Sequence, residues 1–177
     1  MFEAIERVLI SEEELKQAVA TVGKKVGEDF KDKNPVFIGV LKGCFIFMAD
    51  LIRETGIDCT MDFMAVSSYS GTSSTGAVKI NKDLSENIEG RHVIIVEDIL
   101  DSGVTLSYLK KYLMARSPAS ISIVTLMDKP ARRKADVYAD YFCFEVPDEF
   151  VVGYGLDYNE SYRNLPYIGV LKPEIYA

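Results

Sequence analysis

The 177-residue chain has no tryptophan, one histidine, three cysteines and an excess of acidic over basic residues. Three cysteines cannot all pair within one chain, and none lies in a C-x-x-C motif, so a reducing compartment fits best. The formal net charge of −7 provides no overall attraction for nucleic acid or anionic lipid. It does not exclude a local cluster of basic residues. The single histidine, His92, precedes an expected strand and is assigned no role.

The sequence also lacks targeting and membrane segments. No apolar run approaches the ~18 residues that a membrane span needs. The N-terminal residues MFEAIERVLISEEEL are too acidic for a signal or transit peptide. We therefore expect a cytoplasmic protein with no membrane partner and no nucleic-acid partner.

The composition is that of an ordinary folded protein, with 48% hydrophobic and 27% charged residues. A disordered chain, a collagen-like fibre and a coiled coil are thereby excluded. Domains of ~100–200 residues are typical, so residues 1–177 are expected to form one domain.

The first clear element is a helix near residues 11–31. Ser11 and Glu14 match a capping box, and Asn34-Pro35 ends the pattern. Apolar residues then recur every three or four positions, which is typical of a helix with one buried face. This stripe consists of Leu15, Val19, Val22, Val26 and Phe30.

Continuous apolar runs alternate with helical patterns along the rest of the chain. Strands are expected at 36–41, 60–66, 92–96, 121–126 and 141–146, with helices at 45–53 and around 106–113. Residues 67–82 are rich in Ser, Thr and Gly, which predicts a long mobile loop. Apolar strands separated by helices indicate an α/β fold with an open, twisted, mainly parallel sheet. Ligands of such sheets bind beyond the carboxyl ends of the strands.

The strand at 92–96 leads into two acidic residues, Glu97 and Asp98, and then into a short loop before a helix. Backbone N–H groups of such a loop converge at the helix start, where the helix dipole favours an anion, so we predict a phosphate site. The loop residues are Asp101, Ser102, Gly103, Val104 and Thr105. The loop has no lysine and no G-x-x-x-x-G-K-[ST] pattern, which excludes a P-loop.

Adjacent carboxylates at Glu97 and Asp98 are costly unless something neutralises them. A hard cation or vicinal sugar hydroxyls would do so. The other interpretation is an acidic turn with a helix N-cap, because Asp and Ser favour caps.

The run VIIVEDILDSGVTL, residues 93–106, resembles the phosphoribosyl diphosphate (PRPP) binding motif of type I phosphoribosyltransferases. The acidic Asp101 resembles the 6-oxopurine branch, the hypoxanthine-guanine phosphoribosyltransferases; orotate and adenine enzymes usually have another residue there. Segments 41–43, 67–69, 126–129 and 147–163 resemble the same family, so the similarity spans about 36–171. Val104 departs from the family, where many members have a polar residue or lysine.

The resemblance implies that hypoxanthine or guanine reacts with PRPP and Mg²⁺ to give IMP or GMP and pyrophosphate. Glu97 and Asp98 would bind the ribose hydroxyls and orient one Mg²⁺, and Asp157 would hold a second Mg²⁺. Pyrophosphate would be contacted by Lys42, Gly43 and Arg163. The resemblance also implies a cis peptide bond between Leu41 and Lys42.

For the base, the resemblance implies that Asp101 accepts the N7 proton as general base and that Lys129 donates to O6. Ile99 and Phe150 would sandwich the purine, and the backbone of Val151 would read its Watson–Crick edge. The full set of purine-binding residues is then Ile99, Lys129, Phe150, Val151 and Asp157.

The family further implies a core at about 34–147 and a small hood made by the N-terminal residues and about 148–177. The loop at 67–82, with Ser68 and Tyr69 at its start, would close over the substrates. A homodimer or homotetramer is expected. Arg132 and Arg133 lie in a charge run that is typical of solvated loops, so we place them at the surface or in a subunit contact.

Three alternatives remain. Another phosphoribosyltransferase could act on xanthine or a pyrimidine, although Asp101 and Lys129 disfavour a pyrimidine. A regulatory homologue could bind nucleic acid, but it would need a basic face. A Mg²⁺-dependent phospho-acceptor domain would have no use for the 101–105 loop.

Overall fold

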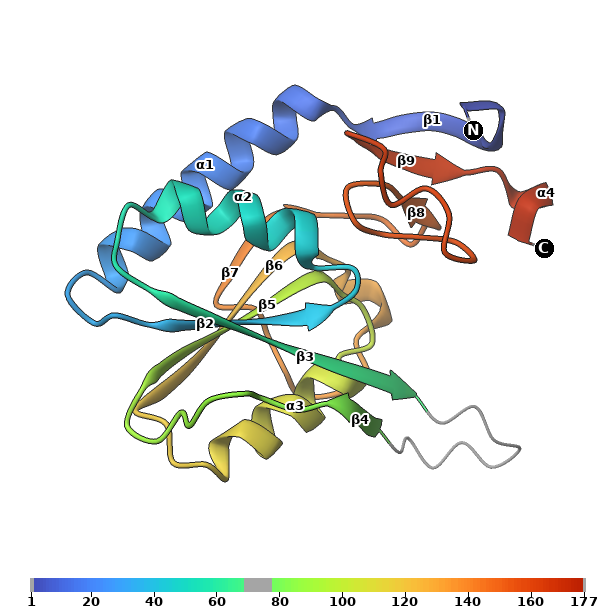
Figure 1. Ribbon diagram of the computed structural model, residues 1–177. Coiled ribbons are helices and arrows are strands. Elements are labelled where there is room, and N and C mark those ends of the chain that lie inside the picture. The colour runs from blue at the N-terminus through green and yellow to red at the C-terminus, as the bar shows by residue number, and fades with distance from the viewer. Residues whose placement is uncertain (1, 69–77, 177) are drawn as a thin grey trace.

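The computed structural model describes residues 2–68 and 78–176 and contains two β-sheets (Figure 1). The larger sheet has six strands in the order β4-β3-β2-β5-β6-β7, and all neighbours are parallel except β3 and β4. The strands are β2 (Val36–Leu41), β3 (Thr60–Ser68), β4 (Val78–Lys82), β5 (His92–Leu100), β6 (Ser120–Asp128) and β7 (Tyr141–Glu145). The expected mainly parallel α/β sheet is confirmed.

Helices cover both faces of this sheet. Helices α1 (Glu12–Asp29) and α2 (Phe45–Thr55) lie on one face and α3 (Val104–Met114) lies on the other (Figure 1). Neighbouring residues of one strand point to opposite faces, so Phe37 joins the core under α1 and α2 while Ile38 joins the core under α3. Burial on both faces explains why the strands are apolar without polar alternation.

The predicted start of α1 is confirmed. The Ser11 hydroxyl accepts a hydrogen bond from the Glu14 backbone N–H, and the Glu14 carboxylate accepts one from the Ser11 N–H. Helix α2 ends at Gly56, whose φ of 64° lies in the left-handed region that favours glycine.

Part of the predicted loop at 67–82 is wrong. Residues 67 and 68 complete β3, and Val78–Lys82 form β4, which pairs antiparallel with β3. Val78 and Ile80 alternate with polar residues, which is the strand pattern that the Ser/Thr/Gly-rich composition concealed. The remaining predicted loop residues, including Tyr69, lie outside the described residues.

The third predicted strand, 92–96, is too short. Strand β5 continues to Leu100 because its backbone keeps its pairing with β6 through Glu97↔Thr125 and Leu100↔Asp128. The two acidic residues therefore lie within the strand rather than after it.

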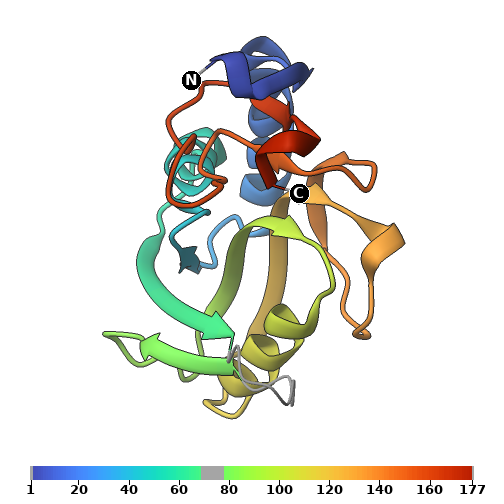
Figure 2. The ribbon, with the colours of Figure 1, turned by 90° about the vertical axis from the view of Figure 1, so that its right-hand side faces the viewer.

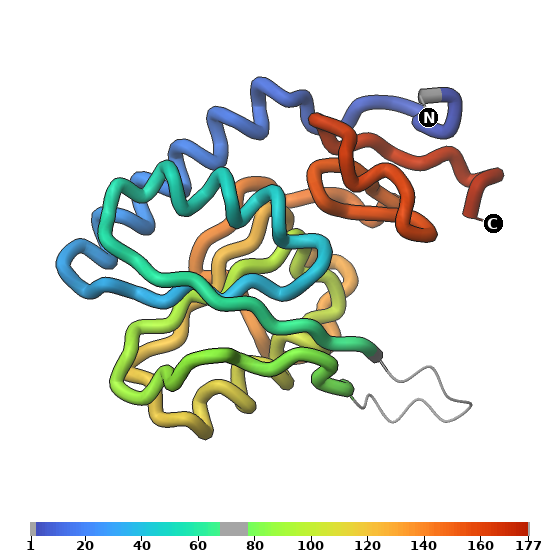
Figure 3. Tube along the Cα trace, viewed as in Figure 1, coloured from blue at the N-terminus to red at the C-terminus, as the bar shows by residue number. Residues whose placement is uncertain are grey.

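The smaller sheet has the order β1-β9-β8 and joins the two ends of the chain (Figures 2 and 3). Its strands are β1 (Ile5–Ile10), β8 (Val151–Val152) and β9 (Ile168–Leu171). Strand β1 was not predicted, because IERVLI is exposed at three of its six positions and needs β9 as an antiparallel partner. The smaller sheet lies on the side to which β2 and β3 point, where ligands of parallel sheets bind.

Short helices complete the fold: η1 (Phe2–Ala4), η2 (Pro130–Arg132) and α4 (Pro173–Tyr176). Within the described parts of the chain, no helix is both long enough and apolar enough to cross a membrane.

Candidate active site

The loop between β5 and α3 surrounds a cavity of about 190 Å³. Glu97, Asp98, Asp101, Ser102, Gly103 and Thr105 are among the residues that line it. Gly103 is the N-cap of α3 with a φ of 78°, and it has no side chain that could cap the helix. A Cβ on Gly103 would lie 2.6 Å from Val137 Cγ1, so both conformation and space require glycine. The N-cap position is therefore held by Gly103 and not by Asp101 or Ser102, although the Ser102 hydroxyl accepts a long hydrogen bond from the first helical N–H.

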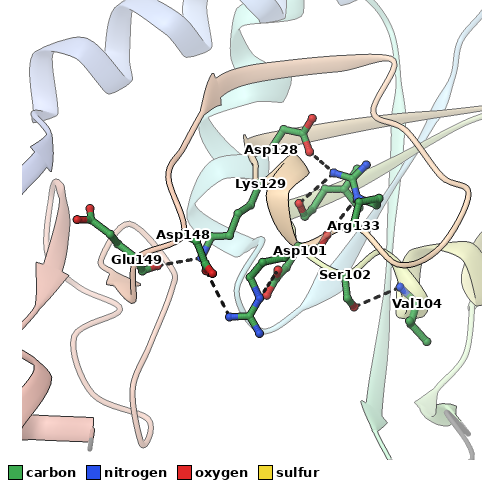
Figure 4. Close-up of polar contacts among 10 residues, drawn as sticks. Asp101, Ser102, Val104, Asp128, Lys129, Arg133, Asp148 and Glu149 are labelled. Atoms are coloured by element: carbon green, nitrogen blue, oxygen red, sulfur yellow. Dashed lines mark hydrogen bonds and ion pairs between the residues drawn. The ribbon is translucent and has the colours of Figure 1, made fainter.

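Arg133 binds the backbone of this loop. Its Nη1 donates to the Val137 carbonyl at 2.7 Å. Its Nε donates to the Asp101 carbonyl at 3.1 Å, and it pairs with Asp128 (Figure 4). The side chain is only 12% exposed, so the prediction that Arg133 lies at the surface is wrong. A charge run in the sequence does not show which of its members finds buried carbonyl groups.

The carboxylates of Glu97 and Asp98 are partly buried at the end of β5. Burial raises the pKa of Glu97 well above its usual range, and repulsion from Asp98 adds to the effect. Burial also raises the pKa of Asp98, to about 6, although the Ile99 N–H donates to its Oδ1 at 2.7 Å and opposes the shift. A cation or donor hydroxyls would relieve this cost, as the sequence analysis expects.

The 41–43 turn lies directly against Asp98. The Leu41–Lys42 peptide bond is cis, as the family resemblance implied. A Cβ on Gly43 would lie 1.7 Å from Asp98 Oδ2, and a Cβ on Gly155 would lie 2.1 Å from the Gly43 carbonyl oxygen. The chain thus packs three segments so closely that only glycine fits at two of the contacts.

Lys42 and Arg163, the two predicted pyrophosphate cations, are brought together by one acidic residue. Glu160 Oε2 lies 2.6 Å from Lys42 Nζ, and Glu160 Oε1 lies 3.1 Å from Arg163 Nη2. Arg163 Nη2 also lies 2.9 Å from Asp157 Oδ1, and the Glu160 N–H donates to Asp157 Oδ2 at 2.8 Å. Glu160 was not predicted.

A larger cavity of about 550 Å³ adjoins the phosphate loop. It is lined by all the predicted purine-binding residues and by the predicted base: Ile99, Asp101, Lys129, Phe150, Val151 and Asp157. Ile99 and Asp101 also line the smaller cavity, so the two cavities meet at these residues. Residues from β5, β6–η2, β8 and the C-terminus thus converge on one space.

Lys129 reaches this space although its side chain is only 6% exposed. Its Nζ donates to the Glu149 carbonyl at 2.8 Å and lies 3.7 Å from Asp148 Oδ1 (Figure 4). Arg132 lies at the surface as expected, with its side chain 52% exposed, and it also lines the cavity. Its Nε lies 3.2 Å from Asp101 Oδ1 and its Nη1 lies 3.5 Å from Asp148 Oδ1.

Comparisons with known proteins identify the family to which this arrangement belongs. A model of the phosphoribosyl transferase domain matches residues 9–159, which is most of the chain. The chain belongs to the phosphoribosyltransferase family. It is 58% identical over 173 residues to the hypoxanthine-guanine phosphoribosyltransferase of Bacillus subtilis, covering 97% of this chain and 96% of that protein.

Other relatives agree. The hypoxanthine-guanine phosphoribosyltransferase of Streptococcus pneumoniae is 50% identical, with 98% of this chain and 97% of that protein covered. The crystal structure of a hypoxanthine phosphoribosyltransferase from Staphylococcus aureus superposes with a TM-score of 0.97 at 50% identity, covering 100% of this chain and 97% of that one. The expected family, its 6-oxopurine branch and the expected fold are confirmed.

Three side chains near the cavities of this phosphoribosyltransferase were not predicted as site residues: Arg132, Glu160 and Tyr176. Tyr176 belongs to α4, four residues at the end of the chain, and no motif marks it. Among the predicted residues, Ser68 ends β3 and Tyr69 lies outside the described residues. Val104 is the first residue of α3, and its N–H donates to Ser102 Oγ at 3.4 Å.

Proposed function

We propose that this phosphoribosyltransferase transfers the 5-phosphoribosyl group of PRPP to N9 of hypoxanthine and guanine, giving IMP or GMP and pyrophosphate. The observation that carries the proposal is the junction of the two cavities at Asp101 and Ile99. A purine in the larger cavity and a ribose phosphate in the smaller one would meet at this point. The named activity of the relatives supports the same reaction.

Asp101 is the proposed general base. It lines both cavities, so its carboxylate can face N7 of the purine while its loop holds the 5′-phosphate. Removing the N7 proton makes N9 a better nucleophile toward the anomeric carbon, and the proton moves to the Asp101 carboxylate. Arg132 pairs with this carboxylate in the structure, so purine binding must compete with that ion pair.

Lys129 is proposed to select 6-oxopurines. Its ammonium lies buried at the cavity wall, where it can donate a hydrogen bond to O6 but cannot accept one from a 6-amino group. Ile99 and Phe150 are proposed to pack on the two faces of the purine, and the Val151 backbone to read its edge.

Mg²⁺ is the proposed cofactor, and the described acidic residues fit its requirements. Glu97 and Asp98 are partly buried carboxylates with raised pKa values, which a divalent cation would stabilise in charged form. No group of three metal-binding side chains occurs in the described parts of the chain, which agrees with a cation that takes most of its ligands from water and substrate. Asp157 is the proposed ligand of a second Mg²⁺. When bound, the metal would neutralise charge on the leaving pyrophosphate.

Lys42, Gly43 and Arg163 are proposed to bind the leaving pyrophosphate. The two side chains already contact a shared carboxylate, Glu160, so they can also contact one bidentate anion. Because Gly43 has no side chain, the Asp98 carboxylate has space beside the proposed anion site.

We further propose that the smaller sheet is the hood expected within one domain, since it packs β1, β8 and β9 beyond the carboxyl ends of the large sheet. A cytoplasmic location is proposed from the three free cysteines. The proposed assembly is a homodimer or homotetramer, and the proposed partners are small molecules without nucleic acid.

The deciding experiment measures pyrophosphate release from PRPP and Mg²⁺ by the purified full chain, with hypoxanthine, guanine, xanthine, adenine and orotate supplied separately. We expect turnover with hypoxanthine and guanine, and their ratio gives the base preference. Turnover confined to adenine or orotate would contradict the proposal. PRPP binding without turnover on any base would instead support the regulatory homologue, which a gel shift with RNA or DNA would then test.

A further inference from the structure

The C-terminal helix α4 brings an aromatic ring to the base cavity. Tyr176 and Pro173 line this cavity together with Phe150. The Tyr176 ring stacks on the Phe150 ring, with 4.8 Å between centroids and 22° between planes. Ile99 of β5 lines the same cavity.

Helix α4 is anchored to the elements that carry Phe150. The Leu171 N–H donates to the Phe150 carbonyl at 2.9 Å, and the Lys172 N–H donates to the Ala4 carbonyl at 3.0 Å. These bonds join the segment before α4 to the start of β8 and to the N-terminal segment. The position of Tyr176 is therefore set by backbone contacts of the smaller sheet as well as by its own ring.

Phe150 is restrained by two tyrosines. Tyr158 meets it edge-to-face at 5.6 Å and 87°, while Tyr176 covers one face. Phe150 is still 37% exposed and lines the cavity, so part of its ring is accessible to a ligand. A platform whose ring plane is fixed before binding loses less conformational freedom when a base stacks on it.

We propose that Tyr176 is a positioning residue for the purine: it backs Phe150 and fixes the ring on which the base stacks. This inference rests on the proposed function, because it assigns a role in 6-oxopurine binding. The ring of Tyr176, rather than its hydroxyl, performs the role. Stacked aromatic pairs contribute enough that loss of the ring should weaken purine binding by roughly 2- to 10-fold.

The test compares Tyr176→Ala with Tyr176→Phe in the full chain, and measures kcat and KM for hypoxanthine, guanine and PRPP. We expect Tyr176→Ala to raise the KM for both purines by roughly 2- to 10-fold, with kcat and the KM for PRPP changed less than about twofold. Tyr176→Phe keeps the stacked ring and should behave as the parent. A merely structural role would instead change all three parameters together.

Ile175→Ala is the matched control, because Ile175 precedes Tyr176 in α4, is 38% exposed and is not part of the base-cavity wall. It should leave the purine KM unchanged. If Tyr176→Ala does not fold, Tyr176→Leu removes the ring while keeping an apolar side chain, and it should show the same rise in KM.

Two results would overturn the proposal. A lower purine KM in Tyr176→Ala would mean that the ring occupies the base position and competes with the purine. An unchanged purine KM would mean that Phe150 does not need this support. If the parent chain turns over neither purine, the proposed function fails first, and calorimetric binding of IMP to parent and variant still shows whether Tyr176 contributes to base binding.

Discussion

The proposed phosphate end of the site is lined by one segment, residues 97–106, whereas the proposed base cavity takes its walls from both sheets and from the C-terminal helix. At the phosphate end, the strand, the left-handed Gly103 and the start of α3 set the geometry locally. At the base end, Lys129, Phe150 and Tyr176 reach one cavity only because the smaller sheet packs beyond the larger one.

This difference has a functional consequence. A local turn fixes the positions of backbone N–H groups. Fixed groups suit the chemical step, in which charge develops on the reacting atoms. A cavity made by several segments has more side chains that can change separately, so base affinity can vary while the chemical step is kept. Substitutions at the phosphate end should therefore mainly lower kcat, and substitutions at the base end should mainly raise the KM for the purine.

The largest effect is expected from Asp101→Asn, since Asp101 belongs to both ends. Loss of a general base should lower kcat by about 100-fold or more, while PRPP affinity changes little because the loop backbone remains. Steady-state kinetics and calorimetric PRPP binding would measure the two quantities. Near-normal turnover would remove Asp101 as the base.

Gly43→Ala should have the next largest effect. The added Cβ would lie 1.7 Å from Asp98 Oδ2, so the turn or the carboxylate must move. Displacements of this size can cost about 100-fold, and we expect a loss of roughly 10- to 100-fold in kcat/KM for PRPP with purine affinity retained.

Gly56→Ala is the control for Gly43→Ala. A Cβ on Gly56 meets no atom within 4 Å, but its φ of 64° is unfavourable for alanine. This variant should lose about 1 kcal/mol of unfolding free energy and keep normal kinetics. If both glycine variants lose only stability, the contact with Asp98 has no functional weight.

Lys129→Met should have an effect that is confined to the base end. Methionine keeps much of the buried volume but loses the charged donor at the cavity wall. We expect the KM for hypoxanthine and guanine to rise by about 10-fold or more, since hydrogen bonds to charged groups contribute about 1.5–3 kcal/mol. Measuring adenine alongside is decisive: equal losses for 6-oxo and 6-amino purines would reject the selective role of Lys129.

The contrast between the ends also explains what could be predicted from sequence. The buried strands, the capping box of α1 and the 97–105 segment were predictable because each is a local pattern. Strand β1 pairs with β9, which lies more than 150 residues further along the chain. Tyr176 stacks on Phe150, about 25 residues before it. No local pattern reveals either contact. Arg133 shows the same limit, because its buried carbonyl partners come from two different segments.

Glu160 gives the site its own counter-ion. Its two oxygens contact Lys42 and Arg163, and its single negative charge offsets part of their charge, so a diphosphate bound here as proposed would exchange with an anion that the chain already supplies. Diphosphate binding would then displace fewer dissolved anions than would be expected for two unpaired cations. Added salt weakens the internal pair as well as the substrate contacts, and the two changes partly cancel. In the proposed site, pyrophosphate binding would therefore depend less on ionic strength than it would at two unpaired cations.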